Sequence, residues 1–451
     1  MSWRINIMGG SLPAPASGIL GSYVSAPPQV FDAATRAYIT PSQSTALHGI
    51  LGKYIFGSEQ FYDYQTKTQL SSSTIHQGPS GKLANYYAIP QQSIDTTGYG
   101  GSQDYSAPII GTTGVKFDYY ISTTGNDSNP GTLSQPWALT SLKLPTYSGN
   151  GPFAYSANQT KMVGKRVGVI AGTYNVMTIF GIASYPGTQV MPPLVFVPGG
   201  TATNQTYLAS CDASGNYAPV GNASGNWAIL NMQGTAANNA AGQSAFGSYG
   251  PQSGYMTIDG MEVTNGYYHL ISAGYATGGY SYITTRVSGV VIQNNYCHGV
   301  TNQIGGENAT CITMYTCHGA IIQNNYVTDI TDNSNRATSI EFWNSDNCII
   351  QYNTMIGSAS QAGGFFIKNQ GLYQNTVRYN YINMSASGTG ANSGGICADL
   401  NGTSANTTSF YNNIVVSNVP VFDNAIPGID GFPNTVESQL WYNNTLSLIH
   451  I

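Results

Sequence analysis

A short pattern of apolar residues followed by polar ones recurs along the second half of the chain. Two apolar residues, a Gln and an Asn pair occupy 291–295 and again 321–325, and weaker copies follow. The last Asn of each copy lies at 295, 325, 353, 380, 413 and 444, so successive copies are 30, 28, 27, 33 and 31 residues apart. A regular period of this length indicates a repeat architecture.

Each repeat carries a second alternating segment about ten residues upstream, at 311–315, 339–343, 364–368 and 395–399. Gly and Asn interrupt every window of helical length, which excludes helical repeats. Two or three short strands per turn, stacked on equivalent strands of neighbouring turns, predict an all-β solenoid of the parallel β-helix type. An inward-turned Asn at each bend would hydrogen-bond its copy one turn away, so we expect a ladder of Asn side chains.

The residues before the repeats resemble a known family. Residues 119–137 (YYISTTGNDSNPGTLSQPW) are similar to the opening motif of right-handed parallel β-helix proteins of the pectate-lyase-like superfamily, and 165–174 (KRVGVIAGTY) resemble the first strand of the same group. The resemblance implies a right-handed, single-stranded parallel β-helix from about residue 116 onward. It is weak for activity, because the superfamily includes polysaccharide lyases, glycoside hydrolases, epimerases, phage tailspikes and non-catalytic adhesins.

The chain divides into two predicted regions. Residues 1–115 are rich in Pro, Gly, Ser, Gln and Tyr and predict a separate head or attachment region, whereas 116–451 predict the β-helix. Residues 199–254 predict a long insertion from an early turn. The sequence stops inside a repeat, and 446–451 resemble a translated sequencing adapter, so we expect a truncated C-terminus without an end cap.

Composition limits the class of partner. The chain has 14 Lys and Arg against 19 Asp and Glu, a net charge of −5, and no basic run longer than Lys165-Arg166, so nucleic acid is not an expected partner. The chain contains no run of about 18 apolar residues, so a membrane span is not predicted. Its N-terminal residues lack the apolar core of a signal peptide. We therefore expect an extracellular or virion-associated protein whose export signal is not recognisable. We expect the six Cys to be small buried side chains.

Alternation in the upstream segments predicts which side chains face outward. The expected outward residues are Thr313, Tyr315, Glu341, Trp343, Phe366, Lys368, Cys397 and Asp399. Aromatic faces beside hydrogen-bonding groups suit a sugar chain, because sugar rings stack on aromatic rings while their hydroxyls find polar partners. We expect this strip to be an exposed groove that binds a polysaccharide.

The first hypothesis is a pectate-lyase-like enzyme that cleaves a uronic-acid polymer by β-elimination. The reaction needs a base and a cation that stabilises the enolate-like charge. Lys368 is the candidate base, Glu341 and Asp399 are candidate calcium ligands, and Arg336 is a further catalytic candidate. Lys368 and Asp399 are expected side by side on adjacent turns, where a carboxylate would raise the pKa of the Lys, so a structural salt bridge is the alternative.

Two other hypotheses follow from the same residues. A glycoside hydrolase is disfavoured, because Glu341 and Asp399 are expected roughly 11–12 Å apart by strand spacing, beyond the roughly 5–9.5 Å of hydrolase carboxyl pairs. A phage tailspike or surface adhesin, possible as a homotrimer, would bind glycans through Tyr315, Trp343 and Phe366 without cleaving them. His269, His298 and His318 lie beside Gly-containing turns and are expected to be solvated. Asp346 could pair with Glu341 in a hydrolase but lies across a turn from it, and is expected to be a turn residue.

Overall fold

The computed structural model describes most of the predicted β-helix. The described residues are 116–144, 154–182, 193–222, 224–234, 244–248, 250, 254–266, 269–274, 286–302, 309–332, 337–357, 363–370, 375–384, 394–401, 408–417, 422–424, 439–442 and 445–448, with four short strands before residue 71. By contacts the chain separates into units 1–91 and 92–451. In the first unit, β1 (Val30–Asp32) pairs antiparallel with β2 (Ala37–Ile39), and β3 (Phe61–Tyr62) with β4 (Gln69–Leu70).

The second unit contains three long parallel sheets, and a complete turn of the chain contributes a strand to sheet one, then to sheet two and then to sheet three. Sheet one consists of β5 (Tyr119–Ile121), β6 (Arg166–Ile170), β9 (Thr206–Cys211), β12 (Met256–Asp259), β16 (Val290–Gln293), β21 (Ile321–Gln323), β25 (Ile349–Gln351), β28 (Thr376–Arg378), β31 (Thr408–Tyr411) and β34 (Gln439–Tyr442).

Sheet two consists of β7 (Gly172–Asn175), β10 (Ala228–Asn231), β13 (Glu262–Thr264), β17 (Tyr296–His298), β22 (Tyr326–Val327), β26 (Thr354–Ile356), β29 (Tyr381–Met384), β32 (Ile414–Ser417) and β35 (Thr445–Leu448). Sheet three consists of β8 (Val195–Phe196), β11 (Ser244–Gly247), β14 (His269–Gly274), β19 (Thr310–Tyr315), β24 (Thr338–Trp343), β27 (Gly363–Gln370), β30 (Gly394–Asn401) and β33 (Phe422–Asn424).

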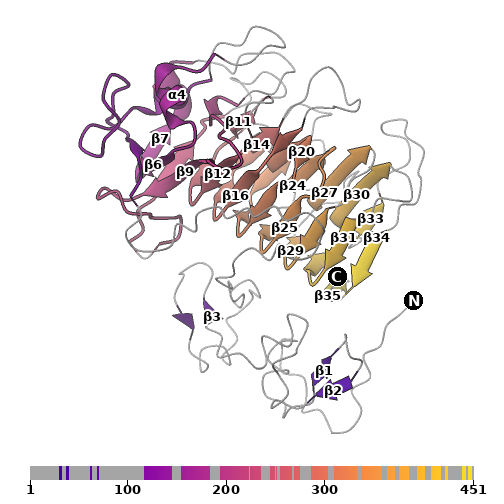
Figure 1. Cartoon of the computed structure of the whole chain (residues 1–451). Helices are drawn as coiled ribbons and strands as arrows, with labels where there is room; N and C mark the ends of the chain where they lie inside the picture. The colour runs from indigo at the N-terminus through magenta and orange to yellow at the C-terminus, as the bar shows by residue number, and fades with distance from the viewer. Residues whose placement is uncertain are drawn as a thin grey trace. The chain divides into compact units, whose positions relative to one another are not determined.

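Successive turns stack like upon like along one axis (Figure 1). For example, β16, β17 and β19 make one turn, and their partners on the next turn are β21, β22 and β24. Two small parallel pairs lie at the bends: β15 (Val287–Ser288) with β20 (Cys317–His318), and β18 (Val300–Asn302) with β23 (Ile330–Asp332). The predicted fold class, an all-β parallel β-helix, is therefore confirmed.

The Asn ladder is present as predicted from Asn295 to Asn413, and Asn444 lies outside the described residues. Asn295, Asn325, Asn353, Asn380 and Asn413 are buried, and each Nδ2 donates to the Oδ1 of the next at 3.1, 3.0, 3.0 and 2.9 Å. The residue before each ladder Asn has a positive φ of 55–60°. This left-handed conformation turns the chain sharply from sheet one into sheet two. Asn, which tolerates it better than most residues, occupies three of the five positions, and Tyr352 and Tyr379 occupy the other two. The ladder therefore satisfies the amides at the bend.

The opening motif closes the first turn through specific contacts. Asp127 accepts hydrogen bonds from the Thr140 hydroxyl at 2.6 Å and the Ser141 hydroxyl at 2.5 Å. Trp137 is fully buried, donates its indole N–H to the Asn129 carbonyl at 2.8 Å and stacks on Tyr119. Three short helices lie in this region: η3 (Leu139–Leu142), α4 (Ala157–Met162) and α5 (Val176–Phe180). The motif is thus structural at this end of the solenoid.

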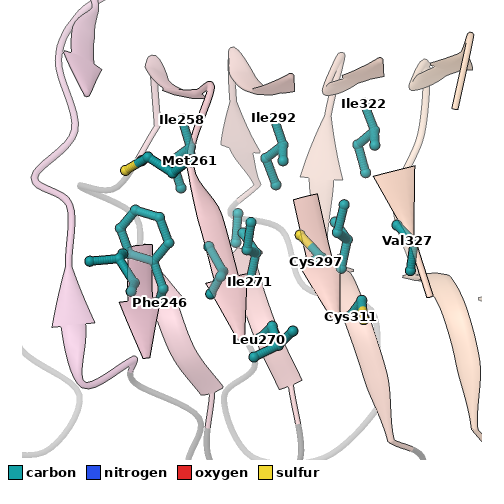
Figure 2. Close-up of a cluster of buried hydrophobic side chains, with 14 of the residues drawn as sticks. Phe246, Ile258, Met261, Leu270, Ile271, Ile292, Cys297, Cys311, Ile322 and Val327 are labelled. Carbon is teal, nitrogen blue, oxygen red and sulfur yellow. The ribbon is translucent and has the colours of Figure 1, made fainter. Parts of the chain in front are cut away.

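The core is a continuous stack of apolar side chains inside the coil. Ile258, Ile292 and Ile322 are partners in register on β12, β16 and β21 and form a row along the axis (Figure 2). Each is fully buried, which is worth about 1.5–3 kcal/mol per side chain. Five of the six Cys are buried and free, which confirms the prediction for them; the Cys397 side chain lies outside the description.

The predicted long insertion at 199–254 is wrong. The segment supplies β9, β10 and β11, one strand to each of the three sheets. Low apolar content between the strands concealed them, whereas the stacking of whole turns identifies them. An excursion remains at 212–227, between β9 and β10. Within the described part of the chain, no helix is long and apolar enough to cross a membrane.

Candidate functional site

The outer face of sheet three aligns the predicted outward residues in two columns. The register aligns Thr313, Glu341, Phe366, Cys397 and Asp423 in one column, and Tyr315, Trp343, Lys368 and Asp399 in the other. Neighbours in a column are one strand apart, about 4.8 Å between backbones. The register therefore places the expected residues of each column side by side, and Asp423 is a further member that the sequence pattern did not indicate. The side chains of Phe366, Lys368, Cys397, Asp399 and Asp423 lie outside the description.

Glu341 is not on an exposed strip, contrary to the prediction. Its side chain has no exposed surface, and its carboxylate accepts a hydrogen bond from the Thr310 hydroxyl at 3.0 Å. Thr313, its neighbour in the column, is also fully buried. The alternation along a strand shows which side chains point out of the coil, but it does not show whether other parts of the protein cover them. Here outward does not mean solvated.

His269 also belongs to this buried cluster, although it was expected to be a solvated turn residue. It begins β14, and its ring contacts the Thr313 hydroxyl through Nδ1 at 3.0 Å and the Tyr315 hydroxyl through Nε2 at 3.1 Å. Burial lowers the pKa of His269 to about 3, partly opposed by a hydrogen bond with the Thr310 backbone. The imidazole is therefore neutral at ordinary pH and holds the Tyr315 hydroxyl in place.

Tyr315 and Trp343 form the partly accessible margin of the cluster. Their rings are 6.1 Å apart between centroids and tilted by 31°, and 8% and 9% of their surfaces are exposed. Next in the column come Lys368 on β27 and Asp399 on β30, which are register partners as predicted. Arg336 lies outside the described residues.

The two candidate calcium ligands are well separated. Glu341 and Asp399 lie two strands apart and two residues offset in register, roughly 11–12 Å between backbones. Calcium binds oxygen at about 2.3–2.6 Å, and the Glu341 carboxylate already has an internal donor. One ion shared by these two carboxylates does not fit this spacing. Among the described residues, no group of three or more His, Cys, Asp or Glu side chains could hold a metal ion.

The outer face of sheet two carries a polar group around His298. This ring contacts the Glu262 carboxylate at 3.1 Å, and the Trp227 indole N–H donates to the other carboxylate oxygen at 2.8 Å. Burial raises the pKa of Glu262, but the hydrogen bonds from His298 and Trp227 outweigh it and lower the pKa overall. His298 is thus paired, contrary to the prediction, and Trp227 fastens the end of the 212–227 excursion.

A second carboxylate, Asp259 of sheet one, is also buried among donors. It accepts hydrogen bonds from the Tyr207 hydroxyl, from the Tyr217 hydroxyl at 2.7 Å, and from the side-chain amides of Asn294 and Gln293 at 2.8 Å each. Burial raises the pKa of Asp259, and these donors oppose the rise. Four internal donors leave the carboxylate little capacity for a ligand. In the sequence, Asp259 lies within 256–261, a weaker copy of the repeat that precedes the copy at 291–295.

Comparisons with known proteins show weak structural likeness only. No family model matches the chain, and no curated protein matches it. Pectate lyase Pel9A is similar at 15% identity and TM-score 0.45, over 67% of this chain and 63% of that one. A rhamnogalacturonan lyase is similar at 12% identity and TM-score 0.33, over 72% and 87%. The GH136 lacto-N-biosidase from Eubacterium ramulus is similar at 15% identity and TM-score 0.29, over 73% and 68%. This chain thus spans less than two thirds of the pectate lyase, and likeness at these scores carries no argument about activity.

Proposed function

We propose that this protein binds a polysaccharide on the outer face of sheet three and cleaves a uronic-acid polymer there by β-elimination. The supporting observation is the column of Tyr315, Trp343, Lys368 and Asp399, in which two tilted aromatic rings are followed by a cationic and an anionic residue on successive turns. Sugar rings stack on such aromatic faces. A column along the solenoid axis also suits a linear polymer.

In this proposal Lys368 removes the proton next to the uronate carboxylate. The neighbouring Asp399 works against that role, because a carboxylate one strand away favours the charged form of the Lys. Calcium enters the proposal at Asp399, where it would offset that effect and stabilise the developing negative charge. Since Glu341 is too distant to share such an ion, the uronate carboxylates would complete the oxygen ligands. Arg336 remains a candidate for the same electrostatic role.

The second candidate function is glycan binding without cleavage, by a phage tailspike or surface adhesin. The observation that favours it is the burial of His269, Thr313 and Glu341, which form hydrogen bonds inside the protein: Thr313 with His269, and Glu341 with Thr310. Such a cluster rigidifies Tyr315, as a binding surface requires, and leaves Glu341 without access to a substrate. A homotrimer and an extracellular or virion-associated location belong to this alternative.

Incubation with polygalacturonate, alginate and capsular polysaccharide, with added calcium or a chelator, separates the two candidates. The lyase proposal expects unsaturated product, read by ultraviolet absorbance, with a loss of about 10²–10⁴-fold in Lys368→Ala and none in Lys165→Ala, an exposed lysine elsewhere. Binding without product that weakens in Trp343→Ala, but not in Tyr326→Ala on sheet two, supports the adhesin. If the protein yields no product and binds none of these polysaccharides, both candidate functions are refuted.

A further inference from the structure

The bend between sheet three and sheet one aligns three residues with complementary chemistry. Ser288 pairs in register with His318 across β15 and β20, and His318 forms a parallel bridge with Asp346 on the following turn. Their spacings of 30 and 28 residues equal those of the first three ladder asparagines. The three residues therefore occupy one position on three successive turns, with His318 in the middle.

The local backbone is the same at all three positions. The next residue is left-handed each time: Gly289 with φ of 69°, Gly319 with φ of 66° and Asn347 with φ of 52°. Each of the three side chains therefore leaves the chain at the point where it turns sharply toward sheet one. A nucleophile on such a bend is presented to its surroundings, as in the sharp strand-to-turn elbows of hydrolases.

His318 and Asp346 are already joined as a base and its orienting acid. His318 Nδ1 lies 2.9 Å from Asp346 Oδ1, and the same oxygen forms an ion pair with Arg286. This contact assigns the proton of neutral His318 to Nδ1 and leaves Nε2 as the basic nitrogen. The His318 side chain is 34% exposed. The hydrogen bond to Asp346 raises the pKa of His318, partly opposed by burial and by Arg286.

Ser288 supplies the hydroxyl that such a pair activates. It is partly exposed and lies one strand from His318, about 4.8 Å between backbones, on the side away from Asp346. Within the described part of the chain its hydroxyl makes no hydrogen bond. Contacts between nucleophile and base are often long in ligand-free proteins and shorten when substrate binds. The register thus supplies the order nucleophile, base and orienting acid.

We propose that Ser288, His318 and Asp346 form an acyl-transfer site that hydrolyses O-acyl esters, with O-acetylated polysaccharide as the substrate class. This activity is separate from the chemistry proposed on sheet three. Acetyl esters are the acyl groups that would lie on a glycan held against the same solenoid. The Gly289 amide, next to the nucleophile, is the candidate donor for the oxyanion.

The proposed reaction has two balanced steps. Ser288 Oγ forms a bond to the ester carbonyl carbon while its proton passes to His318 Nε2; the bond from that carbon to the sugar oxygen then breaks, and His318 returns the proton to that oxygen. Water next attacks the acyl-serine and gives its proton to His318. The bond to Ser288 breaks, acetic acid leaves, and the proton returns to Oγ. Asp346 acts through His318 and is a positioning residue.

The test uses the full chain with a fluorophosphonate probe, 4-nitrophenyl acetate and acetylated xylan. We expect the probe to label Ser288, and Ser288→Ala to abolish labelling and acetate release. His318→Gln should lose at least about 100-fold in kcat/KM, whereas Ser224→Ala, on an exposed loop, should behave as wild type. Asp346→Asn should lower kcat and move its pH profile to lower pH. Circular dichroism and urea unfolding check that each variant is folded.

The proposal is overturned if the probe leaves Ser288 unmodified, or if folded Ser288→Ala hydrolyses both esters at the wild-type rate. An unchanged pH profile in folded Asp346→Asn would reject its positioning role. Because these assays use acyl esters and no uronic-acid polymer, they can fail while the lyase or adhesin proposal stands. The reverse also holds, since loss of product in Lys368→Ala says nothing about acetate release.

Discussion

The Asn ladder allows a quantitative test of what holds successive turns together. Asn353 is 1% exposed, and its Oδ1 accepts from the backbone N–H of Asn325 at 3.1 Å and from Asn325 Nδ2 at 3.0 Å. Its own Nδ2 donates to the Ile322 carbonyl and to Asn380 Oδ1, both at 3.0 Å, and to the Gln351 carbonyl at 3.1 Å. Asn353→Ala therefore leaves two donors and three acceptors without these partners.

The cost follows from the two donors on Asn325. A buried donor that loses its acceptor costs about 1–3 kcal/mol. Asn325 Nδ2 keeps a second hydrogen bond, to the Ile292 carbonyl at 3.0 Å, which places its loss at the low end. We expect Asn353→Ala to reduce the free energy of unfolding by about 3 kcal/mol. Asn226→Ala, at an exposed loop position, should cost no more than about 0.5 kcal/mol.

Urea unfolding followed by both tryptophan fluorescence and circular dichroism measures this difference. Two probes are needed because stacked repeats do not always unfold in one cooperative step. If Asn353→Ala costs less than about 1 kcal/mol, or no more than Asn226→Ala, the ladder does not stabilise the stack. The bends would then depend on apolar packing alone.

Two further predictions concern His269 and Asp127. The pKa of His269 is about 3 in the folded protein and about 6.5 in the unfolded protein. Between these pH values only the unfolded state binds the extra proton, so the free energy of unfolding falls as the pH drops below about 6.5. Urea unfolding at several pH values should show a loss of about 2–3 kcal/mol near pH 4.5 in the wild type and no such loss in His269→Asn. An equal acid dependence in both proteins would contradict it. Asp127→Ala removes the acceptor of the Thr140 and Ser141 hydroxyls, and we expect it to reduce the free energy of unfolding in urea by about 2–4 kcal/mol. A reduction below about 1 kcal/mol would show that this carboxylate does not anchor the opening motif.

The sequence predicts the repeat geometry well because the signals are local and periodic. Alternation identified Ile312 and Ile340 as inward residues, and both are fully buried. The recurring Asn predicted the ladder, since one position repeated once per turn must form a column in a stacked coil. The same phase aligns Ser288 with His318 and Asp346, but three different residue types do not look like a repeat until the turns are stacked.

The candidate site was predicted in part. Its columns follow from alternation, so the alignment of Lys368 with Asp399 could be read from the chain. The burial of Glu341 and the contacts of His269 could not, because they depend on residues tens of positions away in sequence. The strands at 206–211, 228–231 and 244–247 were missed for a related reason: they are recognisable by their partners in the sheets rather than by their own residues.

By itself, then, the amino-acid order determined the winding of the chain, the inward and outward sides of its strands and the Asn column, because each depends on residues close together or one period apart. Tertiary structure alone decided which outward side chains are buried and which acids, bases and hydroxyls meet. Those outcomes depend on contacts across turns and excursions, where a change in one loop length moves a partner while the local pattern stays the same.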